Sequence, residues 1–466
     1  MALEFYNSLT KKVEPFVPLD PDNKTVGLYT CGPTVYSYVT VGNWRTYTLG
    51  DLIARTLRYE GYKANYYMNL TDVGHLTGDN EGDADTGEDR MEKAKRKEGK
   101  NAWEIAEFYT KDFENGYKKL NLTAPNAFLK ATEHIPEQIT LVQKLLNNGF
   151  AYQIGDGIYF DTAAYEAKGY RYGELSNLDH IKAGARVELN PEKKDIRDFA
   201  LWKFSPSNEK RDMEWESPWG VGFPGWHIEC SAMSMQCLGE QFDIHVGGED
   251  LKSTHHPNEI AQSQGATGKV PFVQCWIHGA FLLVDGGRMG KSLGNAYTIQ
   301  DIEAKGINPL ALRFFYLGSH YRSQLNFTWE ALEGAQAALK RIYAHYLELP
   351  PGGIVNEKYR AIFASRIEDD LNTPLALATM WELVKDADIP SVDKKATLLD
   401  FDRVLGLGLA ELKREDIPAE ITALAHAREQ ARQEKDWTCS DELRGEIESQ
   451  GYTVKDTDNG PVVEKK

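Results

Sequence analysis

A strand-like, a helix-like and a second strand-like segment near the N-terminus place the strongest constraint on the fold. Residues 25–30 (TVGLYT) and 65–70 (NYYMNL) are short apolar runs that predict buried strands. Between them, residues 44–59 carry apolar side chains at helical spacing and end before Gly61. This order predicts a βαβ unit and a parallel sheet, which binds ligands at the carboxyl ends of its strands. Cys31 and Thr71 follow directly on the two strands.

The length and charge of the chain exclude several classes of protein. A chain of 466 residues predicts two to four domains. The net charge of −17 argues against a protein that coats nucleic acid by bulk electrostatics, although it allows a local basic face. The sequence has no apolar run long enough to span a membrane, and its start does not resemble a secretory signal. Five scattered cysteines argue against a disulfide framework and for the cytoplasm.

Four side chains have the chemistry and spacing of ligands for one metal ion. His255 and Glu259 are four residues apart, so on a helix they lie on the same face. Cys230 lies upstream, and Cys31 at a strand end is the natural fourth ligand. Zinc prefers such sulfur and nitrogen ligands in tetrahedral geometry. His256 is a competing ligand, and we prefer His255 for its spacing to Glu259. Each residue alone has an ordinary role as core or helix-surface side chain.

A glycine-rich loop at residues 287–295 (GRMGKSLGN) is suited to a polyphosphate. Lys291 supplies a compact positive charge, and the flanking glycines allow the loop to close on a ligand. The loop is not a Walker loop, because the required order of strand, glycine-rich segment and helix is absent. On its own, the tripeptide Gly-Lys-Ser is more often a surface turn.

Several long motifs resemble the cysteinyl-tRNA synthetase family. RMGKSLGN resembles the KMSKS loop of class I aminoacyl-tRNA synthetases, and residues 31–46 (CGPTVYSYVTVGNWRT) resemble their HIGH region in its cysteinyl form. NLTDVGH (69–75), GWHIECSAM (225–233), GGEDLKSTHHPNEIAQS (247–263) and GSHYRSQLNF (318–327) are similar to the same family. The motif order is unbroken from Phe5 to about Thr457.

The resemblance implies a function and a set of site residues. The family uses ATP, with Mg²⁺, to form cysteinyl-adenylate, and transfers cysteine to the 3′-terminal adenosine of tRNA(Cys). It implies one Zn²⁺ held by Cys31, Cys230, His255 and Glu259. It also implies contacts to L-cysteine from Thr71, Trp226 and Asp250, and to the ATP phosphates from Lys291.

The signature motifs depart from the family pattern at several positions. Where the family has His-Ile-Gly-His, this chain has Thr40-Val41-Gly42-Asn43. Thr40 lacks an imidazole, whereas Gly42 keeps the close backbone approach to ATP and Asn43 keeps a polar group. In the second motif, Arg288 replaces a lysine and preserves its charge, and Gly290 replaces a serine. We expect an active enzyme with an altered ATP site, in which Thr40, Asn43, Arg288 and Lys291 take part in catalysis.

The resemblance also implies an α/β fold with a Rossmann-like catalytic domain. We expect its parallel sheet, resumed by strands at 242–246 and 281–284, to be interrupted by an α/β insertion, and to be followed by a helical tRNA-binding region and a small C-terminal domain. The expected parts are the first catalytic half (1–125), the insertion (126–225), the second catalytic half with the loop (226–300), the helical region (301–410) and an anticodon-binding domain (411–466).

Three rival functions and several partner contacts stay open at this point, and one of the rivals is a metal-stabilised scaffold without a substrate. A ligase that joins cysteine to a small amine would not need the C-terminal region, and an inactive RNA-binding paralogue would be consistent with Thr40. We expect a monomer by default. Basic residues in the second half are either tRNA phosphate contacts or solvated helix charges: Arg313, Arg322, Lys340, Arg341, Arg428 and Arg432. The acidic segment 78–89 reads as a solvated loop.

Overall fold

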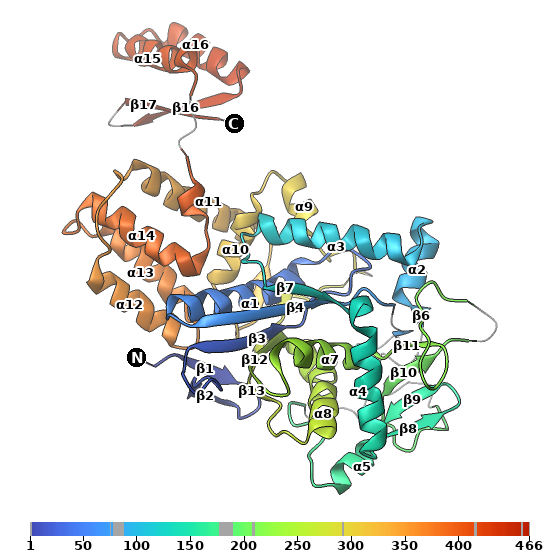
Figure 1. The fold of residues 1–466 in the computed structure, drawn as a ribbon. Coiled ribbons are helices and arrows are strands. Elements are labelled where there is room, and N and C mark those ends of the chain that lie inside the picture. Colours follow the sequence, from blue (N-terminus) through green and yellow to red (C-terminus); the bar gives the residue numbers. More distant parts are fainter. Residues whose placement is uncertain are drawn as a thin grey trace. The chain divides into compact units, whose positions relative to one another are not determined.

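The computed structural model describes residues 2–74, 76–77, 88–176, 190–206, 210–290, 293–413, 417–457 and 460–465. The chain forms two compact units, residues 1–410 and 411–466 (Figure 1). The acidic segment of the sequence falls mostly outside these described residues.

A parallel sheet forms the centre of the first unit. Within the described residues it has five strands in the order β13, β12, β3, β4, β7, and every neighbouring pair is parallel. Their bounds are β13 (Val273–Gly279), β12 (Phe242–Gly248), β3 (Thr25–Thr30), β4 (Lys63–Leu70) and β7 (Ala127–Lys130). Cys31 and Thr71 follow β3 and β4 directly, so the predicted βαβ unit and its strand ends are confirmed.

Helices cover both faces of this sheet (Figure 1). On one face, α1 (Val41–Tyr59) packs on the strands, and α3 (Ala102–Lys119) packs on α1 through stacked rings of Trp44 and Phe113. On the other face lie α7 (Trp226–Leu238) and α8 (His255–Thr267). The helix α1 starts three residues earlier than expected, which brings Gly42 and Asn43 into its first turn. A short basic helix, α2 (Arg90–Glu98), precedes α3.

A second, antiparallel sheet lies between the two halves of the central sheet in sequence. Its strand order is β11 (Gly222–Pro224), β10 (Ala200–Phe204), β9 (Gly157–Phe160) and β8 (Ala151–Ile154). It packs with α4 (Ile135–Asn147) and α5 (Thr162–Ala167) around a core of aromatic and aliphatic side chains that includes Phe160 and Trp202. The segment β7, near the start of the expected insertion, pairs with β4 of the central sheet.

One strand expected in the central sheet is placed elsewhere. The expectation for residues 281–284 was wrong, because β14 (Leu282–Val284) pairs with β15 (Leu325–Phe327) in a separate two-stranded sheet. The central sheet ends instead on β13, whose side chains are almost all buried. A short apolar run identifies a strand but not its partner.

The remainder of the first unit is mostly helical, as predicted. It contains α9 (Ile299–Ala304), α10 (Pro309–Leu317), α11 (Trp329–Glu348), α12 (Glu357–Glu368), α13 (Thr373–Lys385) and α14 (Ser391–Leu405). A hairpin of β1 (Glu4–Asn7) and β2 (Lys12–Pro15) stands at the N-terminus. The second unit packs α15 (Ala419–Gln433) and α16 (Trp437–Ser449) on a hairpin of β16 (Tyr452–Thr457) and β17 (Gly460–Lys465).

Two of the arginines considered as phosphate contacts are structural instead. Arg313 is fully buried and its guanidinium lies 2.7 Å from the carboxylate of Asp51 on α1. Arg428 is also buried, and pairs with Asp456 at 2.6 Å inside the second unit. Neither side chain can therefore contact a tRNA phosphate without breaking its ion pair with the carboxylate.

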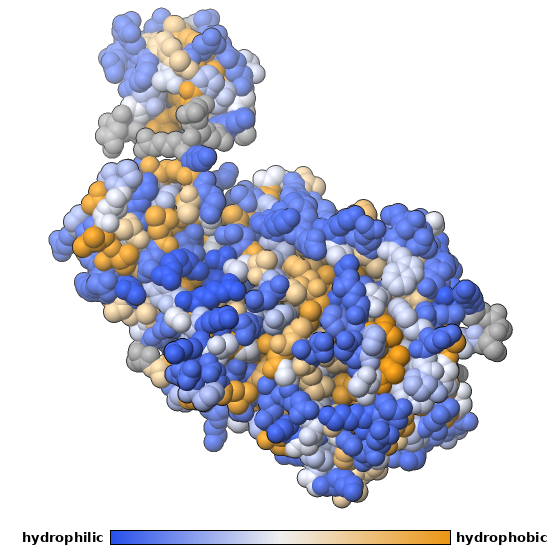
Figure 2. Space-filling view, viewed as in Figure 1, coloured by the Kyte–Doolittle hydropathy of each residue, from blue (hydrophilic) through white to orange (hydrophobic). Residues whose placement is uncertain are grey.

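The visible surface is mainly hydrophilic, with hydrophobic residues in small patches (Figure 2). Within the part of the chain that the structure describes, no helix combines the length and apolar character that crossing a membrane requires.

Candidate functional site

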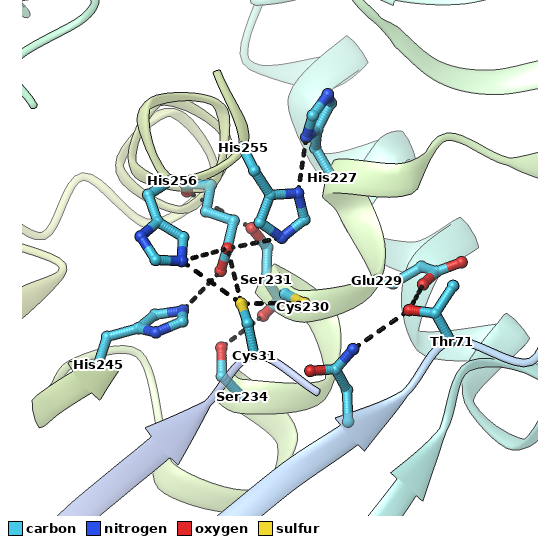
Figure 3. A network of polar contacts seen from close by, with 12 residues as sticks. Cys31, Thr71, His227, Glu229, Cys230, Ser231, Ser234, His245, His255 and His256 are labelled. Carbon is cyan, nitrogen blue, oxygen red and sulfur yellow. Dashed lines mark hydrogen bonds and ion pairs between the residues drawn. The ribbon is translucent and has the colours of Figure 1, made fainter. Parts of the chain in front are cut away.

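Four side chains from distant parts of the sequence converge at the carboxyl end of β3, and Figure 3 labels three of them, Cys31, Cys230 and His255. Cys31 follows β3, Cys230 lies on α7, and His255 and Glu259 lie one turn apart on α8. All four are buried, and one ligand atom of each lies within 4.8 Å of the others. The predicted convergence of these residues is thus present in the structure.

The separations of these atoms fit the edges of a tetrahedron around one zinc ion. The sulfurs of Cys31 and Cys230 are 3.8 Å apart, which is about the separation of two sulfurs that each lie 2.3 Å from zinc. The Cys31 sulfur lies 3.7 Å from Oε1 of Glu259, and Nε2 of His255 lies 3.0 Å from that same oxygen. The donor set therefore fits zinc in both chemistry and spacing.

A second set of ligands shares two members with the first. Cys31 and Glu259 also lie within 4.8 Å of ligand atoms of His245 and His256. Nε2 of His256 is 3.4 Å from the Cys31 sulfur, so distance alone does not exclude His256 as the alternative ligand. However, the second set contains a single sulfur and leaves out Cys230.

Neighbouring imidazoles hold the ligands in place. Nδ1 of His255 shares a 2.9 Å hydrogen bond with Nδ1 of His227, which leaves Nε2 facing Glu259. The second carboxylate oxygen of Glu259 lies 2.9 Å from Nε2 of His245. Metal-binding histidines usually have their other nitrogen fixed in this way. His227 and His245 were missed from the sequence. His227 lies inside the motif at 225–233, whereas His245 lies in the strand β12, before the motif at 247–263.

The electrostatics of the cluster favour a bound cation. Burial raises the pKa of the Cys31 thiol well above its usual range. Burial would also raise the pKa of Glu259, but His245 and His255 outweigh it and lower the pKa to about 2. For His255, burial is outweighed by the Glu259 carboxylate, and the pKa rises to about 10. A divalent ion would replace the proton on His255 and stabilise both thiolates.

A cavity of about 890 Å³ opens beside the cluster. Cys31 and His255 form part of its wall, so the cluster is reachable from the cavity. Trp226 and Asp250 also line it, and the ring of Trp226 lies 4.4 Å from that of His255. Thr71, the third expected cysteine contact, is buried, and its hydroxyl donates to Glu229 at 2.8 Å.

The first turn of α1 lies along the same cavity. Thr40, Gly42 and Asn43 line it, together with Arg288 and Gly290 of the loop. The free amides at the start of a helix favour anions such as phosphates. The hydroxyl of Thr40 donates to Oδ1 of Asn43 at 2.7 Å, so the two replaced motif positions are joined to each other. Lys291 lies outside the described residues.

Two close contacts around α1 were not predicted. A Cβ atom at Gly42 would come within 2.5 Å of the Met289 side chain, so this glycine brings the loop close to the helix. Arg45 is buried and donates to the carbonyls of Ala280, Phe281, His320 and Ser323. Burial lowers the pKa of the Arg45 guanidinium to about 10. The hydrogen bonds to the four carbonyls hold these loops together at one wall of the cavity.

Two family models match the sequence. The model described as "tRNA synthetases class I (C) catalytic domain" matches residues 17–337. The model described as "Cysteinyl-tRNA ligase anticodon binding domain" matches residues 414–461, in the second unit.

Curated relatives match along almost the whole chain. A protein named Cysteine--tRNA ligase 1 from Burkholderia lata is 46% identical over 465 residues, which cover 99% of this chain and 96% of that protein. A Cysteine--tRNA ligase from Treponema denticola is 42% identical over 493 residues, with 98% of each chain covered.

Solved structures of lower identity share the fold. A Mycobacterium tuberculosis methionyl-tRNA synthetase with methionyl-adenylate has a TM-score of 0.52 at 16% identity, covering 82% of this chain and 90% of that one. The Agrobacterium radiobacter K84 LeuRS in its ternary complex has a TM-score of 0.56 at 12% identity, covering 84% of each chain. Together with the central parallel sheet, they confirm the expected fold class.

Proposed function

The chain belongs to the cysteine–tRNA ligase family of class I aminoacyl-tRNA synthetases, and we propose that it joins L-cysteine to tRNA(Cys) at the expense of ATP. The observation that carries the proposal is the buried cluster of Cys31, Cys230, His255 and Glu259 in the wall of the cavity. Such a donor set beside a cavity suits an amino acid that bears a thiol.

We assign one Zn²⁺ to these four side chains. Bound there, zinc supplies selectivity, because it stabilises a thiolate and binds a hydroxyl poorly. Serine differs from cysteine by oxygen in place of sulfur, a change too small for a steric pocket to reject strongly. His227 and His245 orient the imidazole of His255 and the carboxylate of Glu259 for this role.

The remaining cavity residues suit the activation of cysteine by ATP, which enters with Mg²⁺. In this reaction the cysteine carboxylate attacks the α-phosphate and pyrophosphate leaves. The chain has to position the reactants and offset negative charge. The first turn of α1 presents Gly42 and Asn43 to the phosphates, and Arg288 and Lys291 supply positive charge from the loop. Thr40 holds Asn43 by a hydrogen bond.

We propose that Trp226 and Asp250 contact the amino acid directly. Both line the cavity next to the cluster, and the indole of Trp226 packs on His255. Thr71 would contribute indirectly, through its hydrogen bond to Glu229.

The second unit favours tRNA as the acceptor over a small amine. A ligase for a small amine has no need of a unit that matches an anticodon-binding model. We therefore propose that α15, α16 and the β16–β17 hairpin bind the anticodon end of tRNA(Cys). None of the five cysteines forms a disulfide, which suits a reducing compartment such as the cytoplasm. We expect the enzyme to act as a monomer.

Charging of tRNA(Cys) by the purified, zinc-loaded protein tests the proposal. We expect cysteine-dependent exchange of pyrophosphate into ATP, then ATP-dependent formation of cysteinyl-tRNA(Cys), with serine giving no product at equal concentration. Absence of both exchange and charging with cysteine would refute the proposal and favour an inactive paralogue. Exchange with transfer to a small amine, but never to tRNA, would favour the small-amine ligase.

A further inference from the structure

Two large aromatic side chains are exposed side by side at the edge of the cavity. Tyr38 lines the cavity two residues before Thr40, and 39% of its surface is exposed. Phe108 on α3 is 43% exposed, and its ring centroid lies 6.2 Å from that of Tyr38. Tyr109 contacts both rings edge-on, at 5.2 and 5.1 Å. Aromatic residues usually bury most of their surface, so an exposed pair suggests a binding role.

Positive charge lies next to these rings, in a chain whose net charge is −17. The ammonium of Lys100 lies 4.5 Å from the centroid of the Phe108 ring. The preceding helix α2 has five basic and two acidic residues. The hydroxyl of Tyr109 donates to Glu98 at 2.6 Å, which fixes the end of α2 beside the aromatic rings. Lys100 also pairs with Glu98 at 3.4 Å, so Glu98 connects the end of α2 to both Lys100 and Tyr109.

Aromatic rings beside lysines are the usual binding surface for unpaired nucleotides. The bases stack on the rings, and the basic side chains offset the phosphate charge. A protein partner could also use exposed aromatic residues. Here the aromatic surface continues directly into the cavity through Tyr38, and a cavity of about 890 Å³ admits single nucleotides but not a duplex. An unpaired nucleic-acid end therefore fits better than a protein.

We propose that the exposed rings of Tyr38 and Phe108, supported by the buried Tyr109 and flanked by Lys100, form a stacking surface for the unpaired 3′-terminal nucleotides of tRNA, and guide this end into the cavity. The inference rests on the proposed function, because it takes tRNA as the acceptor. Phe108 is the residue to test, since its ring is exposed and takes no part in the cluster or the nucleotide contacts described above.

Three substitutions at Phe108 separate stacking from simple apolar contact. Phe108→Ala removes the ring, Phe108→Leu keeps an apolar side chain without a π face, and Phe108→Trp keeps a larger π face. Lys100→Gln tests the charge. Val17→Ala serves as a control, since Val17 is 71% exposed in the same unit. Thermal unfolding of each variant verifies that the fold is intact.

Two RNA transcripts locate the contact on the tRNA. One is full-length tRNA(Cys), and the other ends at its last paired nucleotide. We expect Phe108→Ala and Phe108→Leu to lose about tenfold in affinity for the full-length transcript and in kcat/KM for charging it, as expected for one lost stack. The truncated transcript should bind all variants like the wild type. Phe108→Trp and Val17→Ala should match the wild type, and Lys100→Gln should show a smaller loss that salt reduces.

The outcomes distinguish this inference from the proposed function. Cysteine-dependent pyrophosphate exchange needs no tRNA, so it should be the same in all variants. If the wild type shows no such exchange, the proposed function fails. If exchange is normal but Phe108→Ala binds and charges tRNA like the wild type, the stacking surface is wrong. Equal losses on both transcripts, or a Phe108→Leu variant as good as Phe108→Trp, would also overturn it.

Discussion

The sulfurs of Cys31 and Cys230 lie 3.8 Å apart, although 199 residues separate them in the chain. The first follows the central strand β3, and the second lies on a helix that the chain reaches only after the inserted antiparallel sheet. Their separation is about that of two thiolates on one zinc ion. Because both sulfurs are buried beside a carboxylate, they would repel it as bare thiolates, and a shared cation would relieve this repulsion.

Removing one sulfur tests the cluster as a zinc site. We expect Cys230→Ser to lower zinc affinity by more than about 100-fold, since loss of a supporting residue alone costs about 10- to 100-fold. Cysteine activation should fall with it. Cys237→Ser is the matched control, because Cys237 lies on the same helix α7 but outside the cluster. Metal analysis after dialysis gives the zinc content. Equal zinc content in the two variants would contradict the assignment.

A comparison of two adjacent histidines decides between the two ligand sets. We expect His255→Ala to lose most of its zinc, because it removes the ligand that faces Glu259 at 3.0 Å. His256→Ala should keep one zinc per chain, since His256 lies 3.9 Å from the same oxygen and its other nitrogen contacts His278. Zinc titration with a competing chelator measures both affinities. A larger loss in His256→Ala would assign the site to the second set.

Much of this arrangement was readable from the sequence. The strands β3 and β4 are continuous apolar runs, and the spacing of His255 and Glu259 placed both on one helical face. The spacing to Glu259 favoured His255 over His256, but both histidines lie close to the cluster, because adjacent residues at a helix start can each face one site. The partner of β14 was missed, since strand pairing depends on contacts far away in sequence.

The contacts of the buried arginines could not be predicted from the sequence either. Arg313 lies in the apolar helix α10, but only the fold shows that Asp51 is its partner. The donation of Arg45 to four carbonyls likewise depends on loops that meet only in three dimensions. The signature motifs located the site, whereas the residues that support it required the structure.

The buried pair of Asp51 and Arg313 should be important for stability. Asp51→Ala leaves the Arg313 charge unpaired, which we expect to cost about 3–5 kcal/mol of unfolding free energy. Asp22→Ala is the control, because its ion pair with Lys24 is exposed and should contribute about 0–1 kcal/mol. Denaturant unfolding at pH 7 measures both changes. A similar small effect of the two substitutions would show that the buried pair is not stabilising.

The Asp51 carboxylate also makes the free energy of unfolding depend on pH, and the direction of this dependence can be predicted. Burial would raise the pKa of Asp51, but Arg313 and Arg55 outweigh it and hold the pKa below its ordinary value. The carboxylate thus stabilises the fold above the unfolded pKa of about 3.9, and this stability is lost as the pH falls through the folded value. We expect the difference in unfolding free energy between the wild type and Asp51→Ala to shrink below about pH 4. A constant difference from pH 7 to pH 3 would contradict this linkage.

Substitutions at Thr40 test whether the altered first motif contacts ATP. Thr40→His restores an imidazole at the edge of the cavity, and we expect it to raise kcat/KM for ATP by about tenfold through a hydrogen bond to a phosphate. Thr40→Ala is the control, because both substitutions remove the hydrogen bond to Asn43 but only one adds a donor. Pyrophosphate exchange at varied ATP concentrations provides the values. A Thr40→His variant no better than Thr40→Ala would show that this position does not contact ATP.

The central claim is that the metal held by Cys31, Cys230, His255 and Glu259 binds the substrate through its sulfur. Replacing zinc with Co²⁺ makes this visible, because sulfur bound to cobalt gives a charge-transfer absorption in the near ultraviolet. The decisive measurement is this absorption during titration with L-cysteine and with L-serine. We predict a saturable increase with cysteine and none with serine. An identical, unchanged spectrum with both amino acids would contradict the account.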